Sequence, residues 1–544
     1  MESQKQENLL SLSLTATKEE REKSRILNVG INQQQGTYEV IVKYHGNLKA
    51  LESETIKVEE LLGGYAILTL PEAAISYVAA LPMIEYMELP KSLVYDIYEA
   101  KQVSCVSPAE NPPLGLTGEG VLLAVLDSGI DYFLEDFKKG RESRILYLWD
   151  QTGIPDAETK KLPPSGFTIG VEYDQEMLDL ALMAKTREEA MRIVAQTDER
   201  GHGTAVTAVA ASSNSNPLLR GVAPKSGLVI VKLRPAQADG FPSTTELMRG
   251  ISYCIKKAQE LNRPLVINLS FGNAYGPRDG SSLVEQFLDQ AASRGRTCLC
   301  IGAGNEGVSA GHFSGNLNNI DRVELAIDLR EPTVNVQLWK FYEDSFILIL
   351  QAPDGERFQV PVSEGVGRTT FFWQSTRILV YSGEPSPYST KQEIFFVFLP
   401  EGEYLDSGIW SFIFENKTVI AGGIQLYLPA AAQRNRGTVF LRQNPELTIT
   451  NPATTVRAIS VAAYNGRTGT YAEFSGRGEE NGEKELLWEQ RNKPDLAAPG
   501  VDIKAVAPGG ESLSYSGTSF ATPLVSGSAA LLMEWGDGVI IRLS

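Results

Sequence analysis

The stretch that decides the fold is S-Y-S-G-T-S-F-A-T-P at residues 514–523, which leads into a run of small and apolar residues at 524–535. Ser519 follows a glycine turn and stands at the start of a segment with helical patterning. Backbone N–H groups at the start of a helix lack intrahelical partners and point toward negative charge that develops nearby. Ser519 is therefore a candidate nucleophile, and a base and an orienting acid are expected upstream.

Two upstream segments supply the expected partners. An apolar strand at residues 121–126 ends in Asp127, which places this carboxylate at the carboxyl edge of a sheet. His202 lies between two glycines that let the backbone crowd around its ring, and small residues follow. The chain order Asp, His, Ser is one of the orders in which a serine-protease triad occurs. Asp127, His202 and Ser519 are thus the predicted catalytic residues.

With these motifs in place, the chain resembles the subtilisin-like serine proteases. It carries D-S-G-I-D at 127–131, G-H-G-T at 201–204, S-G-T-S-F-A-T-P at 516–523, and G-A-G-N at 302–305 between the last two. The resemblance implies that Asn305 donates a hydrogen bond to the oxyanion, since such a donor occurs at this place in the family.

The resemblance also implies which backbone segments bind an extended substrate: they are Ser270, Phe271 and Gly272 on one strand and Gly302, Ala303 and Gly304 on the next. The opposite wall of the cleft is expected at residues 234–241. For Gly272 a plain turn is the alternative to a binding role.

The region around these motifs has the rhythm of an α/β fold. Continuous apolar runs at 228–233, 265–270 and 297–301 alternate with helical patterns at 244–261 and 283–294. Buried strands separated by helices predict a subtilisin-like parallel sheet with helices on both faces. The connection at 137–200 is longer than in a simple subtilisin. It contains a strand-like run at 145–150 and helical spacing at 183–195, and its role is open.

Residues 1–96 form a separate N-terminal region. Strand patterns at 38–44, 65–70 and 84–89 surround a helical pattern at 72–81. This order resembles the small α/β propeptide of subtilases, which implies that the region occupies the active-site cleft as an inhibitor and that the chain cuts itself near Tyr95. The alternative is a regulatory domain that is never cut.

The catalytic region is interrupted by a different pattern. Residues 97–311 and 448–544 carry the catalytic motifs, whereas residues 312–447 contain short, aromatic-rich strand patterns separated by turns such as Asp354-Gly355. These strands predict an inserted β-sandwich, jelly-roll-like in kind. The chain ends nine residues after Trp535, an unusually short C-terminus, which is expected to expose apolar surface on the helix that follows Ser519.

Composition excludes several functions. The 544 residues have a net charge of −17 and no dense basic run, which argues against a nucleic-acid partner. Neither a secretory signal nor a membrane span is recognised in the sequence. The four cysteines lack metal-ligand spacing, so no metal or other cofactor is assigned, and Cys298 and Cys300, which alternate along an apolar strand, are expected to pack in the core rather than form a disulfide. Structural calcium is common in subtilases, but no ligands for it can be named.

A subtilase with a short prosegment, no signal and a sandwich inserted before the serine resembles the Csp germination proteases of clostridial spores. That resemblance implies a location in the spore and a protein substrate, the proenzyme of a spore-cortex hydrolase. Two alternatives stay open. One is a binding or signalling pseudoprotease whose intact triad is idle, and the other is a cytoplasmic intracellular subtilisin, although simple forms of that kind lack the inserted domain.

Overall fold

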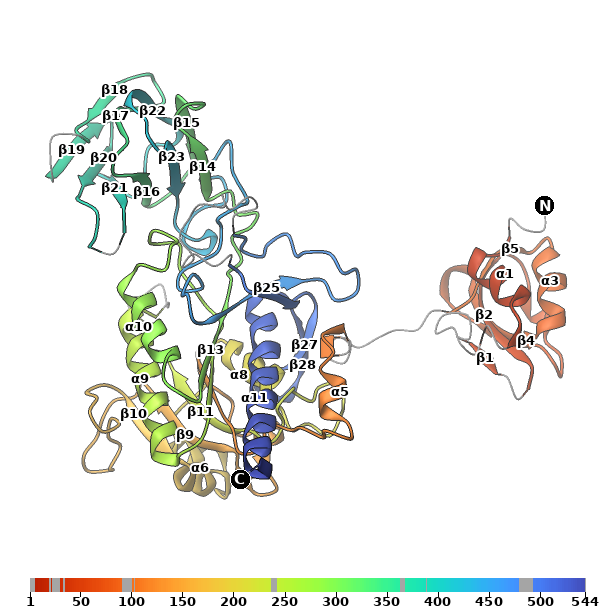
Figure 1. Cartoon of the computed structure of the whole chain (residues 1–544). Helices are drawn as coiled ribbons and strands as arrows, with labels where there is room; N and C mark the ends of the chain where they lie inside the picture. The colour runs from red at the N-terminus through yellow and green to blue at the C-terminus, as the bar shows by residue number, and fades with distance from the viewer. Residues whose placement is uncertain are drawn as a thin grey trace. The chain divides into compact units, whose positions relative to one another are not determined.

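The computed structural model describes residues 5–18, 21, 30–32, 35–90, 100–101, 103–235, 242–362, 367–387, 389–478 and 493–543. It divides the chain into two compact units, Met1–Val94 and Tyr95–Ser544, each of which is described by itself (Figure 1).

The first unit is a small α/β domain. Its antiparallel sheet has the order β1 (Ile31–Asn32), β2 (Thr37–Tyr44), β4 (Tyr65–Pro71), β3 (Lys57–Glu60), with β5 (Ile84–Glu88) also paired to β2. Helices α1 (Asn8–Thr15) and α3 (Glu72–Ala80) contact β5, and α3 also contacts β4. Alternate residues of β2 and β4 are buried, as expected for a sheet covered on one face.

The second unit is built on an eight-stranded sheet. Its order is β10 (Val171–Asp174), β9 (Ile145–Asp150), β11 (Gly227–Lys232), β6 (Leu122–Asp127), β12 (Leu265–Leu269), β13 (Thr297–Gly302), β25 (Ile459–Tyr464), β26 (Leu496–Pro499). All neighbours are parallel except the edge pair β10 and β9. The predicted parallel sheet is confirmed, and its central strands are buried on both faces.

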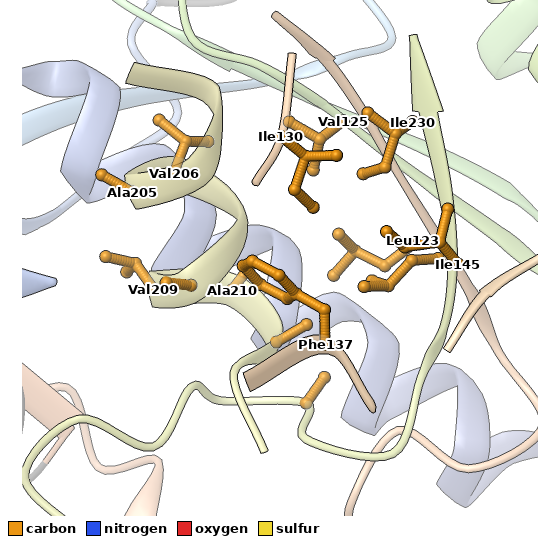
Figure 2. Packing of buried hydrophobic residues seen from close by; sticks show 14 of the residues in the cluster. Leu123, Val125, Ile130, Phe137, Ile145, Ala205, Val206, Val209, Ala210 and Ile230 are labelled. Atoms are coloured by element: carbon orange, nitrogen blue, oxygen red, sulfur yellow. The ribbon is translucent and has the colours of Figure 1, made fainter. Parts of the chain in front are cut away.

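Helices cover both faces of this sheet (Figure 1). On one face α8 (His202–Ala211) and α11 (Thr518–Leu543) pack on β6 and β13; on the other lie α9 (Thr244–Leu261) and α10 (Leu283–Ala292). Successive residues of β6 point to opposite cores. Figure 2 shows the first core, where Val206 and Ala210 of α8 face Leu123 and Val125 of β6.

The inserted segment forms a β-sandwich, as predicted. One antiparallel sheet has the order β14 (His312–Asn316), β23 (Gly423–Tyr427), β16 (Val334–Phe341), β21 (Lys391–Pro400), β20 (Thr376–Ser382), β19 (Gly367–Trp373). The second has the order β18 (Arg357–Val360), β17 (Ser345–Gln351), β22 (Gly408–Thr418), β15 (Arg322–Ile327), β24 (Val439–Phe440). Both sheets contribute to a single aromatic-rich core, separate from the two cores of the parallel sheet.

The long connection at 137–200 extends the main sheet. It contributes β9 and β10 and the helices α6 (Gln175–Leu182) and α7 (Arg187–Ile193), together with the hairpin of β7 (Lys138–Lys139) and β8 (Glu142–Ser143). Helical spacing was expected at 183–195, and α7 lies within that range, whereas α6 was not predicted. The Thr186 side chain accepts a hydrogen bond from the Glu189 N–H and so begins a new helix there.

The remaining elements of the second unit are the short helix α5 (Ser107–Glu110) and the hairpin of β27 (Ile503–Val506) and β28 (Ser512–Tyr515), which precedes α11. On α11 Leu532 and Trp535 are exposed, 67% and 50%. Within the described residues, none of the helices has the length and apolar character that a bilayer span requires.

Candidate active site

Asp127 and His202 are brought together by a close contact between a strand and a helix. Asp127 is the last residue of β6, and His202 is the first residue of α8. Gly203 permits the approach, because a Cβ atom on it would lie 2.3 Å from the backbone oxygen of Gly129 and 3.1 Å from Cβ of Asp127. Since the interior is close-packed, a larger residue at 203 would push the helix away from the strand.

The Asp127 carboxylate holds the His202 ring by a direct hydrogen bond. His202 Nδ1 donates to Asp127 Oδ1 over 2.8 Å, and the Ser128 N–H donates to the same oxygen over 2.7 Å. Asp127 is 7% exposed, and its Oδ2 has no hydrogen-bond partner among the residues that the structure describes. The proton on Nδ1 leaves the lone pair of Nε2 available to a proton donor.

Opposing influences set the pKa of His202. Burial of the ring and the positive charge of Arg200 disfavour the charged form of His202. The charge and hydrogen bond of Asp127 and the charge of Asp198 favour it. The attraction to carboxylates prevails and raises the pKa of His202 above the ordinary value of 6.5. The Asp127 charge thus makes the ring a stronger base toward the Ser519 proton.

Ser519, the second residue of α11, is close to His202 but is not bonded to it. The ring of the next residue, Phe520, meets the His202 ring edge-on, with centroids 5.6 Å apart. Ser519 Oγ donates to the backbone oxygen of Ser270 over 3.0 Å, and within the described part of the chain no hydrogen bond joins it to His202. The hydroxyl must leave the Ser270 oxygen before it can give its proton to the ring.

Asn305 is oriented from the start of α11. Its Oδ1 accepts hydrogen bonds from the backbone N–H and the Oγ1 of Thr518, over 3.0 Å and 3.2 Å. Because a backbone N–H can only donate, the amide oxygen must face it, and the Nδ2 donors face away. Asn305 is exposed at the site. Its Nδ2 and the Ser519 N–H at the start of α11 can therefore donate to an anion beside Ser519.

The expected substrate-binding segments follow two adjacent parallel strands, Ser270, Phe271 and Gly272 after β12 and Gly302, Ala303 and Gly304 at the end of β13. A Cβ atom on Gly272 or on Gly304 would lie 2.4 Å from Thr450 Oγ1, so both glycines admit the segment that follows the inserted sandwich. The Ala303 backbone is paired internally, with Val461 and Thr450.

Other predicted site positions fall outside the described residues. These are Tyr95 and residues 236–241 of the expected opposite wall. At the start of that wall Arg234 is described, and its Nη2 pairs with the buried carboxylate of Glu246 over 3.1 Å.

Two residues around the site were not singled out from the sequence. Thr518 orients Asn305, and its place directly before Ser519 was a signal that could have revealed it. Asp198 is a buried carboxylate bonded to the turn that carries His202. Its signal is the acid four residues before the histidine in D-E-R-G-H-G-T.

In the part of the chain that the structure describes, no three or more His, Cys, Asp or Glu side chains are grouped so that they could hold a metal ion. Cys105, Cys254, Cys298 and Cys300 are free thiols, and Cys254 and Cys300 are buried.

Comparison with known families matches two parts of the chain. Residues 4–91 match the Csp protease B prodomain, and residues 118–324 and 416–538 match the subtilase family. The unmatched stretch between the last two ranges lies within the inserted sandwich.

Comparison with individual proteins gives the same assignment. The solved structure of the Clostridium perfringens CspB protease is 32% identical, covers 82% of this chain and 87% of its own, and has a TM-score of 0.72. The major intracellular serine protease of Bacillus subtilis is 26% identical over 43% of this chain and 54% of its own length. Subtilisin E of the same organism is 36% identical over 19% of this chain and 23% of its length. The match thus spans about half, or less, of these two curated relatives.

Proposed function

This chain belongs to the subtilase family of serine proteases, and from that membership we propose that it is a serine endopeptidase with Asp127, His202 and Ser519 as its triad. The observation that carries the proposal is the hydrogen bond of 2.8 Å between Asp127 and His202 beside the first turn of α11. Ser519 belongs to that turn, and the Thr518 N–H beside it orients the Asn305 amide.

The proposed reaction begins with a proton transfer. His202 Nε2 takes the Oγ proton of Ser519 as Oγ attacks the carbonyl carbon of the scissile peptide, and Asp127 stabilises the imidazolium that forms. Asn305 Nδ2 and the Ser519 N–H bind the negatively charged oxygen of the tetrahedral intermediate. His202 then gives its proton to the leaving amine, and water hydrolyses the acyl-enzyme by the same route.

We propose further that the chain cuts itself near Tyr95 and that the N-terminal unit is its prosegment. The match of residues 4–91 to the Csp protease B prodomain supports this, as does the division of the chain into compact units between Val94 and Tyr95. A cut there would leave both units intact, because each has its own hydrophobic core.

For the substrate we propose the proenzyme of a spore-cortex hydrolase, and for the location the spore. The support is the likeness to the CspB protease, which covers more than four-fifths of both chains. Cleavage of such a proenzyme by this protein, and not by the Ser519→Ala variant, is the outcome that we expect.

One observation favours a second candidate, a catalytically idle binding protein of the germination apparatus. The Ser519 hydroxyl is bonded to the Ser270 carbonyl oxygen instead of the His202 ring. While that hydrogen bond persists, the Ser519 hydroxyl has no base that can accept its proton.

Labelling with a small fluorophosphonate distinguishes the two candidates, because such a reagent captures a serine that an adjacent base has activated. We expect labelling at Ser519 in the wild type and at least a 100-fold slower reaction in His202→Ala. Thermal melts establish that both proteins are folded. Equal rates in the two proteins, or a folded wild type that never reacts at Ser519, would decide for the idle protein.

A further inference from the structure

A second buried carboxylate lies next to the proposed triad. Asp198 is 7% exposed and belongs to the last part of the 137–200 connection, for which the sequence indicated no role. Its two oxygens accept four hydrogen bonds. Oδ1 accepts from Ser128 Oγ over 2.7 Å and from the Gly201 N–H over 2.9 Å, and Oδ2 accepts from the N–H and Oγ1 of Thr204 over 2.8 Å and 2.6 Å.

These bonds join the segments that carry the acid and the base. Ser128 directly follows Asp127, and its N–H donates to the Asp127 carboxylate. Ser128 Oγ also accepts from the Gly203 N–H over 3.0 Å, on the other side of His202. Asp198 therefore holds the backbone on both sides of His202. It accepts directly from the Gly201 N–H before the histidine, and it orients the Ser128 hydroxyl that accepts from the Gly203 N–H after it.

The start of α8 is held by the same carboxylate. Gly201 is the N-cap of α8 and Thr204 is its third residue. N–H groups at this end of a helix lack intrahelical partners. A carboxylate at this end also interacts favourably with the helix dipole. The Thr204 hydroxyl also bonds the loop after β6, because its oxygen accepts a hydrogen bond from the Asp131 N–H over 2.9 Å.

We propose that Asp198 is the positioning residue of the proposed triad, which locks the turn after Asp127 to the first turn of α8 so that His202 stays on the Asp127 carboxylate. This inference rests on the proposed function. It also assigns a role to the 137–200 connection, because Asp198 belongs to this segment. Asp198 itself does not touch the reacting atoms.

The charge of Asp198 has a consequence that a purely structural role would lack. Among the described residues, the charged groups that act on His202 are Asp127 from β6 and Asp198 and Arg200 from the segment before α8. Tyr515 lies nearby, since its ring stacks on Phe520, and burial, together with the charge of Asp198, raises its pKa. Asp198 favours the protonated ring. Its removal is therefore expected to lower the pKa of His202.

The substitution Asp198→Asn tests this. Four donors converge on the carboxylate, and an amide offers them only one accepting oxygen, so its NH₂ group must face donors. The matched control is Asp136→Asn. Asp136 is 5% exposed and accepts hydrogen bonds from Ser212 Oγ and Asn214 Nδ2 beyond the other end of α8. Both variants lose one buried carboxylate at an end of the same helix, and only one of these lies near His202.

The first measurement is the pKa of His202 by NMR of histidine-labelled full chain, made in the Ser519→Ala background so that the chain stays uncut. The three histidines are distinguishable: His312 is buried with a pKa of about 3, and His45 is identified by His45→Gln. We expect Asp198→Asn to lower the pKa of His202 and Asp136→Asn to leave it unchanged.

The second measurement is the rate of self-cleavage in chains that keep Ser519. We expect Asp198→Asn to slow it by about 100-fold, the effect of a small misplacement of catalytic groups, with little change in Asp136→Asn. The inference is overturned if Asp198→Asn leaves the His202 pKa unchanged, or if it slows cleavage no more than the control. A wild type that is never cut would instead remove the proposed function, and the NMR measurement would still decide the positioning role.

Discussion

At the scale of single residues, the acid and base of the site are fixed while the nucleophile is not. Asp127 is bonded to the His202 ring and to Ser128, and the pKa of His202 is raised accordingly. Ser519 instead donates to the Ser270 carbonyl oxygen. Catalysis therefore requires the Ser519 hydroxyl to exchange this hydrogen bond for one to His202.

Asn305→Leu is expected to lower the rate of self-cleavage by about 100- to 1,000-fold, because it removes one donor to the oxyanion while it keeps the volume of the side chain. The cleavage time course on gels measures the effect. Since Asn305 is exposed, the melting temperature should change little. A variant that cleaves at the wild-type rate would remove Asn305 from the oxyanion hole.

The rate of fluorophosphonate labelling should fall as the pH is lowered, because only the neutral His202 ring can take a proton. The Asp127 charge raises the pKa of the ring, so the midpoint of this fall is expected above 6.5. In Asp127→Asn the charge is gone, and any residual labelling should have its midpoint at a lower pH. A wild-type rate that does not fall as the pH is lowered would contradict the assignment of His202 as the base.

At the scale of elements, the close packing of α8 against β6 sets the geometry. Gly203→Ala is expected to destabilise the protein by about 1–3 kcal/mol, because its methyl group would lie 2.3 Å from a backbone oxygen that cannot move aside freely. Urea unfolding measures the change. Gly295→Ala is the control, since no atom lies within 4 Å of its added Cβ. Equal stability of the two variants would show that the helix can shift.

The principal elements of the parallel sheet could be predicted from the sequence because their apolar runs are continuous and their ends carry the motifs. The pattern at 244–261 corresponds to α9, for example. The helical pattern at 183–195 contains α7 but extends past both of its ends, because the spacing does not show that Thr186 caps the helix, and α6 was not predicted. Hydrophobic spacing records which face is buried, and it does not record where one helix ends and another begins.

At the scale of the whole molecule, the inserted sandwich is tied to the loop that follows the expected substrate-binding strand. Gln337 of β16, 1% exposed, accepts from the Gly276 N–H over 2.9 Å and donates to the Ala274 oxygen over 3.2 Å. Tyr275 between them donates to Asn335 over 3.0 Å. The loop begins directly after Gly272, so these hydrogen bonds hold the sandwich against the segment expected to bind substrate.

Gln337→Leu should therefore lower stability by about 1–3 kcal/mol for each backbone group left unpaired, and it should slow self-cleavage as well. Calorimetry and the cleavage time course measure these effects. Gln359→Leu, on an exposed position of β18, is the control and should change neither. Loss of stability without any loss of cleavage would show that these hydrogen bonds do not influence the site.

The architecture and the fold class were predictable from motif order and strand rhythm, and both are confirmed. The roles of Asp127, His202, Ser519 and Asn305 stay predictions. The acid at 198 was visible in the sequence, but its hydrogen-bond network was not, because three of its four donors come from Ser128 and Thr204, and only the folded chain brings these residues around one carboxylate. Local sequence shows the acid, whereas the network is a property of the tertiary structure.

The central claim, that the triad is functional, is tested most directly by the intact mass of the purified wild type beside Ser519→Ala. The account predicts two fragments in the wild type, separated near Tyr95, and one uncut chain in the variant. An uncut wild type with a cooperative melt would contradict it, and so would cleavage at the same position in Ser519→Ala.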